Sequence, residues 1–142
     1  MKIVRGRSID KALEKAVRVY MCGNLEQDEE INFIHTSGLE IALSKYDVFT
    51  AEKPHYHSFN HEYNFVVEGE VKVFSINENK VYHLKRHDLF LVEPNQPYVS
   101  KAKEGAEVIV VKSPGGNDKV MVEGLSSSVL AWLESWDNHL ME

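Results

Sequence analysis

Short hydrophobic runs separated by turn residues fill the middle of the chain. The runs lie at residues 39–49, 63–67, 71–76, 89–92 and 108–111, and the main turn segments at 77–80, 94–97 and 114–118. Short strands with turn signals at this frequency are typical of an all-β sandwich or barrel. Because no helical pattern stands between successive runs, a parallel sheet of βαβ units is not expected. The pattern therefore predicts an all-β fold.

Both ends of the chain show helical spacing instead. Hydrophobic residues recur at helical intervals after Ser8, which predicts an N-terminal helix over about residues 8–22. The pattern after Ser126 predicts an amphipathic C-terminal helix over about residues 126–140. Residues 24–30 are polar and acidic, so we expect them to form a solvated loop.

The length of the chain, 142 residues, fits one domain. Hydrophobic residues make up 43% of it and charged residues 27%, which is enough apolar surface for a packed core. We expect a single domain over residues 1–142, with the barrel core at about residues 33–113.

The charge balance narrows the range of partners. With 16 Lys and Arg against 22 Asp and Glu, the formal charge is −6, which disfavours nucleic acids and anionic membranes. Cys22 is the only cysteine, so neither a disulfide framework nor a multi-cysteine zinc site is possible within the chain. No apolar run approaches the roughly 20 residues that cross a bilayer, and the start lacks a secretory signal pattern. We expect a cytoplasmic protein.

A cluster of histidines carries the candidate chemistry. His55, His57 and His61 lie within seven residues, and Glu62 follows at once. Residues two apart on a strand project from the same face, so His55 and His57 could form a three-ligand metal site with Glu62. Two imidazoles and one carboxylate suit divalent Fe, Mn, Ni, Co or Zn, and the spacing does not choose among them. The spacing alone is equally compatible with polar residues on an exposed strand.

The residues around this cluster resemble the first conserved motif of the cupin superfamily. That motif is two histidines separated by one residue, then three or four residues, a glutamate, six residues and a glycine. His55, His57, Glu62 and Gly69 match it at every position. The resemblance covers roughly residues 40–113. It implies a small double-stranded β-helix, or jelly-roll barrel, with a metal held inside by His55, His57 and Glu62 and open at one mouth. It also implies a homodimer.

The second cupin motif is similar to residues 87–98 but departs from the usual pattern. The positions that align are Asp88, Pro94 and Pro97. His87 and Asn95 stand where the motif has glycines, and both residue types tolerate positive φ, so the turns could survive. Tyr98 replaces the histidine that usually supplies a fourth metal ligand.

Three consequences of Tyr98 stay open at this point. The triad could hold the metal alone, Tyr98 could coordinate it as a phenolate, or the metal could be lost and the site become a ligand pocket. We expect Tyr98 to be the catalytic acid or base if there is turnover.

Two further residues are candidates for substrate binding. Asn64 would share the inward face of Glu62 on one strand, and His61 would lie in the loop beside the site. By the same alternation, Tyr63 would point outward and serve packing.

The function that these features favour is a metal-dependent enzyme acting on a small oxygen-bearing metabolite, such as a sugar or an organic acid. The first alternative is a non-catalytic barrel that binds or senses a small metabolite with a weakened or absent metal. A metal-free isomerase that uses histidine and tyrosine ranks after both.

Overall fold

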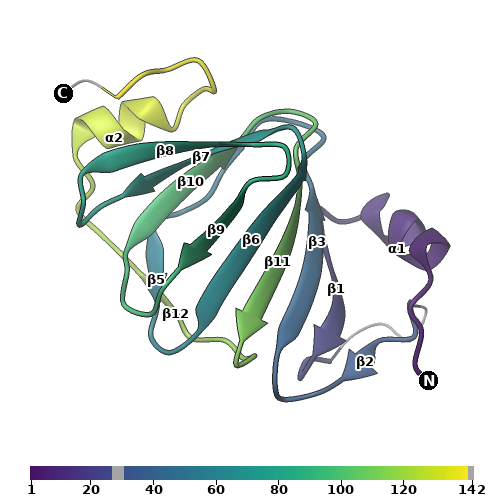
Figure 1. The fold of residues 1–142 in the computed structure, drawn as a ribbon. Coiled ribbons are helices and arrows are strands. Elements are labelled where there is room, and N and C mark those ends of the chain that lie inside the picture. The colour runs from purple at the N-terminus through teal and green to yellow at the C-terminus, as the bar shows by residue number, and fades with distance from the viewer. Residues whose placement is uncertain (27–30, 141–142) are drawn as a thin grey trace.

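Two β-sheets that face each other make up most of the fold, with a short helix near each end of the chain (Figure 1). The computed structural model describes residues 1–26 and 31–140. Residues 27–30 of the predicted acidic loop lie outside the described residues. The elements are α1 (Gly6–Leu13), β1 (Arg18–Gly23), β2 (Ile34–His35), β3 (Glu40–Lys45), β4 (Thr50–Ala51), β5 (His55–His57), β6 (His61–Glu68), β7 (Glu70–Ser75), β8 (Lys80–Lys85), β9 (Leu89–Val92), β10 (Tyr98–Ala102), β11 (Glu107–Ser113), β12 (Lys119–Met121) and α2 (Ser127–Trp132).

The strand order confirms the predicted all-β fold. Sheet A has the order β2-β1-β3-β11-β6-β9, and sheet B has the order β12-β5-β10-β7-β8, with β4 paired to β10. All pairs are antiparallel except β1 with β2. The inward residues of both sheets form one apolar core, which includes Val66, Val73 and Val110. Strands that carry candidate ligands in both sheets therefore face the same interior.

Three positions where the cupin motifs have glycine adopt positive φ. Gly69, between β6 and β7, has a φ of +79°, and a Cβ there would lie 2.7 Å from the Cα of Ala106. His87 and Asn95 adopt φ of +72° and +62°, as their residue types allow, so both turns of the second motif persist without glycine. The amide of Asn95 donates to the carbonyl of His57 at 2.7 Å, which ties the second motif to the first.

The N-terminal helix is shorter than the predicted range of 8–22. It ends at Leu13, and Arg18–Gly23 instead forms strand β1, paired with β3. The hydrophobic residues between 16 and 20 satisfy a helical spacing as well as a strand, and pairing along β3 decides between them. The sheets thus extend beyond the predicted barrel core of about 33–113, because β1 precedes this range in the chain and β12 follows it.

The C-terminal helix also stops earlier than predicted. Ser126 caps it as expected, accepting a hydrogen bond from the amide of Val129, but the helix ends at Trp132 rather than near residue 140. The reason is Lys101, which is fully buried on the outer face of β10. Its Nζ donates to the carbonyls of Trp132, Ser135 and Asn138 at 2.7, 2.8 and 3.0 Å, respectively. Because these carbonyls converge on one ammonium group, they cannot all point along a helix axis.

The segment held by Lys101 covers the outer face of sheet B. Trp132 and Val129 pack there against Phe74 and Val99. Neither helix in the described part of the chain is long and apolar enough to span a bilayer.

We predict that Lys101→Met lowers the free energy of unfolding by about 2–4 kcal/mol, because it leaves buried carbonyls without a donor. Thermal and urea unfolding would measure the loss, and hydrogen exchange would show faster exchange in residues 126–140. Lys103→Met is the matched control. Its Nζ pairs with Glu70 at 3.0 Å at the surface, so we expect a change below about 1 kcal/mol. Equal effects of the two substitutions would contradict the role of Lys101.

Candidate metal centre and adjoining pocket

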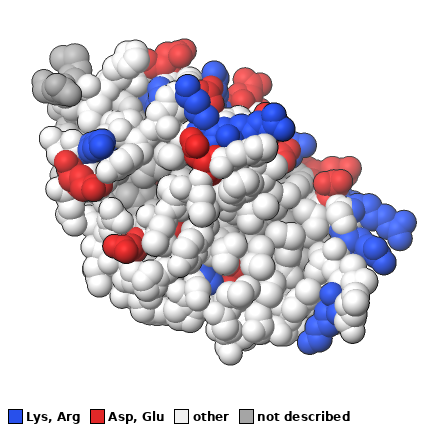
Figure 2. Space-filling model, in the orientation of Figure 1, with Lys and Arg blue, Asp and Glu red and all other residues white. Residues whose placement is uncertain are grey.

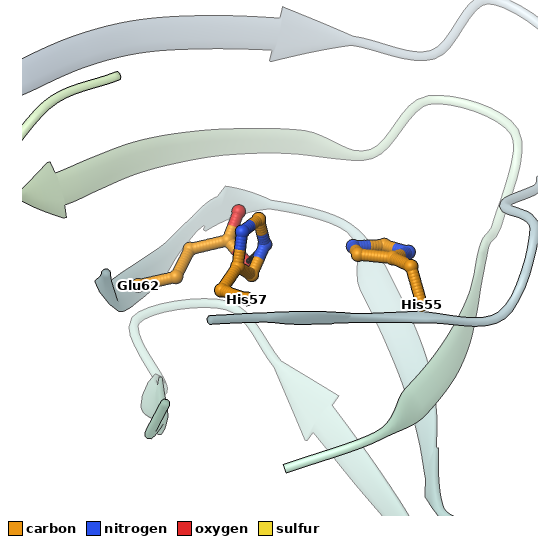
Figure 3. A group of neighbouring side chains, drawn as sticks. All are labelled: His55, His57 and Glu62. Atoms are coloured by element: carbon orange, nitrogen blue, oxygen red, sulfur yellow. Dashed lines mark ion pairs between the residues drawn. The ribbon is translucent and has the colours of Figure 1, made fainter. Parts of the chain in front are cut away.

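Three buried side chains from the two sheets converge inside the barrel. His55 and His57 lie on β5 of sheet B, and Glu62 lies on β6 of sheet A (Figure 3). One candidate ligand atom from each residue lies within 4.8 Å of the others, and all three side chains are buried. The spacing of the two histidines therefore places both rings inward, rather than on an exposed strand.

The orientation of both imidazole rings is fixed through Nδ1. That of His55 lies 2.8 Å from the carbonyl of Lys53, and that of His57 lies 2.7 Å from Oδ1 of Asp118. In each ring Nε2 is then the nitrogen left for the interior. Nε2 of His57 is buried and has no hydrogen-bond partner among the described residues, although it lies 3.1 Å from Oε2 of Glu62. A close approach without hydrogen-bond alignment suits two ligands of one ion, so these residues fit a divalent metal.

Asp118 is the functional neighbour that sequence reasoning missed. Besides His57, its carboxylate accepts hydrogen bonds from the amides of Phe59 and Asn60 and from Nδ2 of Asn60, at 2.9, 2.7 and 2.7 Å. It thus holds both the ring of His57 and the loop that leads to Glu62. Asp118 lies beyond both motifs and reaches the site because the adjacent strand β12 pairs with β5, so no local sequence pattern marks it.

Tyr98 lies directly beside the triad. Its hydroxyl donates to Oε2 of Glu62 at 2.7 Å, and its ring centroid lies 4.7 Å from that of His55. Burial and the nearby carboxylate of Glu62 raise the pKa of Tyr98 well above its ordinary value. In this structure Tyr98 is therefore a neutral phenol that supports Glu62, and not a phenolate.

The three groups shift one another's pKa values. Burial alone would raise the pKa of Glu62, but its contact with His57 and the hydrogen bond from Tyr98 lower it to about 2. Burial alone would lower the pKa of His57, but Glu62 and Asp118 together raise it above its ordinary value. The pKa of His55 is lowered, chiefly by burial. Glu62 is thus an anion, the form in which a carboxyl group binds a metal, whereas an imidazole binds one in its neutral form.

The other candidate residues on β6 differ in burial and in the face on which they lie. Asn64 is buried on the inward face, with Nδ2 3.4 Å from the carbonyl of Glu62. Tyr63 points outward and is partly exposed, as the alternation predicts. His61 is exposed at the start of β6, and the structure does not bring it to the triad.

Two hollows lie near Tyr98, and Tyr98 and Phe90 line both. Of the triad, Glu62 lines the inner one, and no triad residue lines the outer one. The inner cavity, of about 30 Å³, lies inside the barrel beside Glu62 and Asn64 and has room for little more than water. The outer pocket, of about 320 Å³, opens between the β7–β8 hairpin and β9. The residues that line the outer pocket are Val73, Ser75, Glu78, Tyr82, Leu84, Phe90, Leu91, Val92, Glu93, Gln96 and Tyr98. A pocket of this size suits a small molecule.

Comparison with protein-family models gives a match to the cupin domain over residues 43–112, which includes both motifs. The chain belongs to the cupin superfamily. Among curated proteins, no match was found.

Solved structures agree with this cupin assignment. KdgF from Halomonas sp. is 25% identical, with a TM-score of 0.54 over 61% of this chain and 77% of that one. A protein with a double-stranded β-helix domain from Klebsiella pneumoniae is 21% identical, with a TM-score of 0.54 over 63% and 78% of the two chains. Pac13 from Streptomyces, a nucleoside dehydratase, is 15% identical, with a TM-score of 0.54 over 64% and 73%. The last two likenesses concern the fold alone, and the fold is the predicted double-stranded β-helix.

Removing the negative charge that holds His57 tests the geometry of this cupin site. We predict that Asp118→Asn weakens the binding of Co²⁺ or Zn²⁺ by about 10- to 100-fold, because the ring of His57 loses its charged acceptor. Calorimetric titration of the metal-free protein would measure it. Asp88→Asn is the matched control, because Asp88 accepts from the amide of Lys85 in an exposed turn. Equal metal affinity in both variants would contradict the role of Asp118.

Proposed function

We propose that this cupin is a metal-dependent enzyme that acts on a small oxygen-bearing metabolite, a sugar or an organic acid. The observation that carries the proposal is the convergence of three buried side chains, His55, His57 and Glu62, each with one candidate ligand atom within 4.8 Å of the others. His55, His57 and Glu62 would hold a divalent transition metal, which is Fe, Mn, Ni, Co or Zn.

Each group of the site has a separate role in the proposed reaction. A bound divalent metal supplies Lewis-acid polarisation of a substrate oxygen. Tyr98 lines the outer pocket and holds a proton on its hydroxyl, which is hydrogen-bonded to Glu62. We assign to it the transfer of that proton to a substrate that reaches the hydroxyl. Asn64 lines the inner cavity beside Glu62, where its amide can donate to or accept from an oxygen that reaches the triad.

A second candidate function is a cupin that binds or senses a metabolite without turnover. The hydrogen bond from Tyr98 to Oε2 of Glu62 favours it, because it satisfies the carboxylate in the absence of a metal. The two candidates differ in whether the purified protein holds an ion.

We predict that the purified protein contains close to one divalent transition-metal ion per chain and that His57→Ala removes it, since the triad loses one of its imidazoles. Elemental analysis by mass spectrometry would measure both. His61→Ala is the matched control, because His61 is exposed and should leave the metal in place. Tyr98→Phe should also retain the metal, whereas its loss there would make Tyr98 a ligand. Negligible metal in the wild type and His57→Ala alike would favour the binding function.

A homodimer belongs to the same proposal. The outward face of β6 and β9 exposes Tyr63, Leu89 and Leu91, with 61% of Leu89 accessible. The surface over β6, β9 and β11 is mostly uncharged, whereas Lys and Arg gather along the upper edge and around α1 (Figure 2). An apolar sheet face of this kind suits a second copy of the chain.

A cytoplasmic location is also proposed, in keeping with the unpaired, buried Cys22.

We predict that light scattering after size-exclusion chromatography gives the mass of a dimer and that Leu89→Glu gives a monomer, because the carboxylate would be buried at the contact. Val120→Glu is the matched control, since Val120 is an exposed apolar residue of β12 in the other sheet. A monomeric wild type would contradict the proposed dimer.

A further inference from the structure

One residue that lines the outer pocket, Ser75, has a buried hydroxyl without a hydrogen-bond partner among the described residues. Ser75 ends β7, and its Cα is paired with that of Tyr98 on β10. Only 3% of Ser75 is exposed, and its Oγ has no hydrogen-bond partner among the described residues. Ser75 lines the outer pocket together with Tyr98. A buried hydroxyl without a partner costs stability, so its presence here points to a ligand that completes it.

The charges around the outer pocket all have one sign. Glu78 and Glu93 line it, and no Lys or Arg is among its lining residues in the described chain. Arg18 lines the inner cavity, and it contributes with Lys53 and Lys119 to another hollow, of about 430 Å³, so none of these cations lines the outer pocket. An anionic metabolite would meet two carboxylates in the outer pocket and no compensating side-chain cation.

The other lining groups suit hydroxyl groups on an apolar ring. Tyr98 and Gln96 offer a hydroxyl and an amide, and the two carboxylates are strong acceptors for hydroxyl protons. Glu78 already accepts from the hydroxyl of Tyr82 at 3.2 Å, so that ring is held at the pocket. Apolar walls, among them Leu84 and Phe90, provide the surface against which the C–H face of a ring packs.

We propose that the outer pocket binds an uncharged, polyhydroxylated molecule of about the size of one sugar and discriminates against its carboxylate analogue, with Ser75 as a specificity-determining residue. This inference rests on the proposed function, because it takes the outer pocket as the place where the substrate lies beside Tyr98. Of the two substrate classes considered, sugars and organic acids, it selects the first.

Three matched pairs of probes test this selectivity. They are D-glucose with D-glucuronate, D-galactose with D-galacturonate, and D-mannose with D-mannuronate, in which only the sixth carbon changes from an alcohol to a carboxylate. Titration of each into the ¹⁵N-labelled full-length protein would report affinity from the amide shifts of β7, β8 and β9. We expect at least one neutral sugar to shift these amides and to bind at least about tenfold more tightly than its uronate.

Variants separate a role in binding from a role in folding. Ser75→Ala should lower the affinity for the neutral sugar by about two- to tenfold. It should leave the melting temperature of the ligand-free protein unchanged or raised, since no hydrogen bond is lost. Ser44→Ala is the matched control. Ser44 is as deeply buried but accepts from Nε of Arg18 at 2.7 Å, so its loss should lower the melting temperature and leave sugar affinity unchanged.

The opposite outcomes would overturn the proposal. These are uronates that bind as tightly as the neutral sugars or more tightly, neutral sugars that cause no shift in β7–β9, or Ser75→Ala that lowers the melting temperature as Ser44→Ala does. The titrations are run both with the metal as purified and with a chelator. A protein that is purified without metal and selects neutral sugars would reject the metal-dependent enzyme and keep this inference. A protein that is purified with one metal ion per chain and binds no neutral sugar would keep the enzyme and reject this inference.

Discussion

The site depends on the two acceptors that hold the histidine rings by Nδ1. With Nδ1 of His55 on the carbonyl of Lys53 and Nδ1 of His57 on Asp118, both rings turn Nε2 toward the interior and toward Glu62. The carboxylate of Asp118 also fixes the amides of the loop between His57 and Glu62. Outer partners of this kind set the direction and the basicity of a metal ligand. Without them the same three side chains could be buried and still not share an ion.

Tyr98 joins this site to the rest of the barrel interior. Where cupins usually carry a histidine, this chain has a phenol that donates to Glu62 and separates the inner cavity from the outer pocket. The substitution exchanges a possible fourth ligand for a proton donor at the base of a pocket of about 320 Å³. The geometry thus places a set of three candidate ligands beside a phenol that lines a pocket, and the proposed choice of an uncharged molecule follows from the acidic lining of that pocket.

The sequence predicts the parts of the molecule that depend on local geometry. Alternation along a strand places His55 and His57 together, and tolerance of positive φ explains His87 and Asn95. Sequence patterns do not predict the features that depend on contacts between residues distant in the chain. Residues 18–23 become a strand because β3 pairs with them, and the C-terminal helix stops because Lys101 binds its carbonyls. No local sequence pattern marks Asp118 or Ser75. Asp118 contacts His57 across 61 residues of sequence, and Ser75 is notable because its Oγ has no hydrogen-bond partner among the described residues.

X-ray absorption spectroscopy of the zinc-loaded protein tests the central claim most directly, because it identifies the atoms bound to the ion. The account predicts two imidazole nitrogens at about 2.0–2.1 Å, with oxygen ligands completing the shell. A spectrum without imidazole scattering, or with sulfur in the shell, would contradict it.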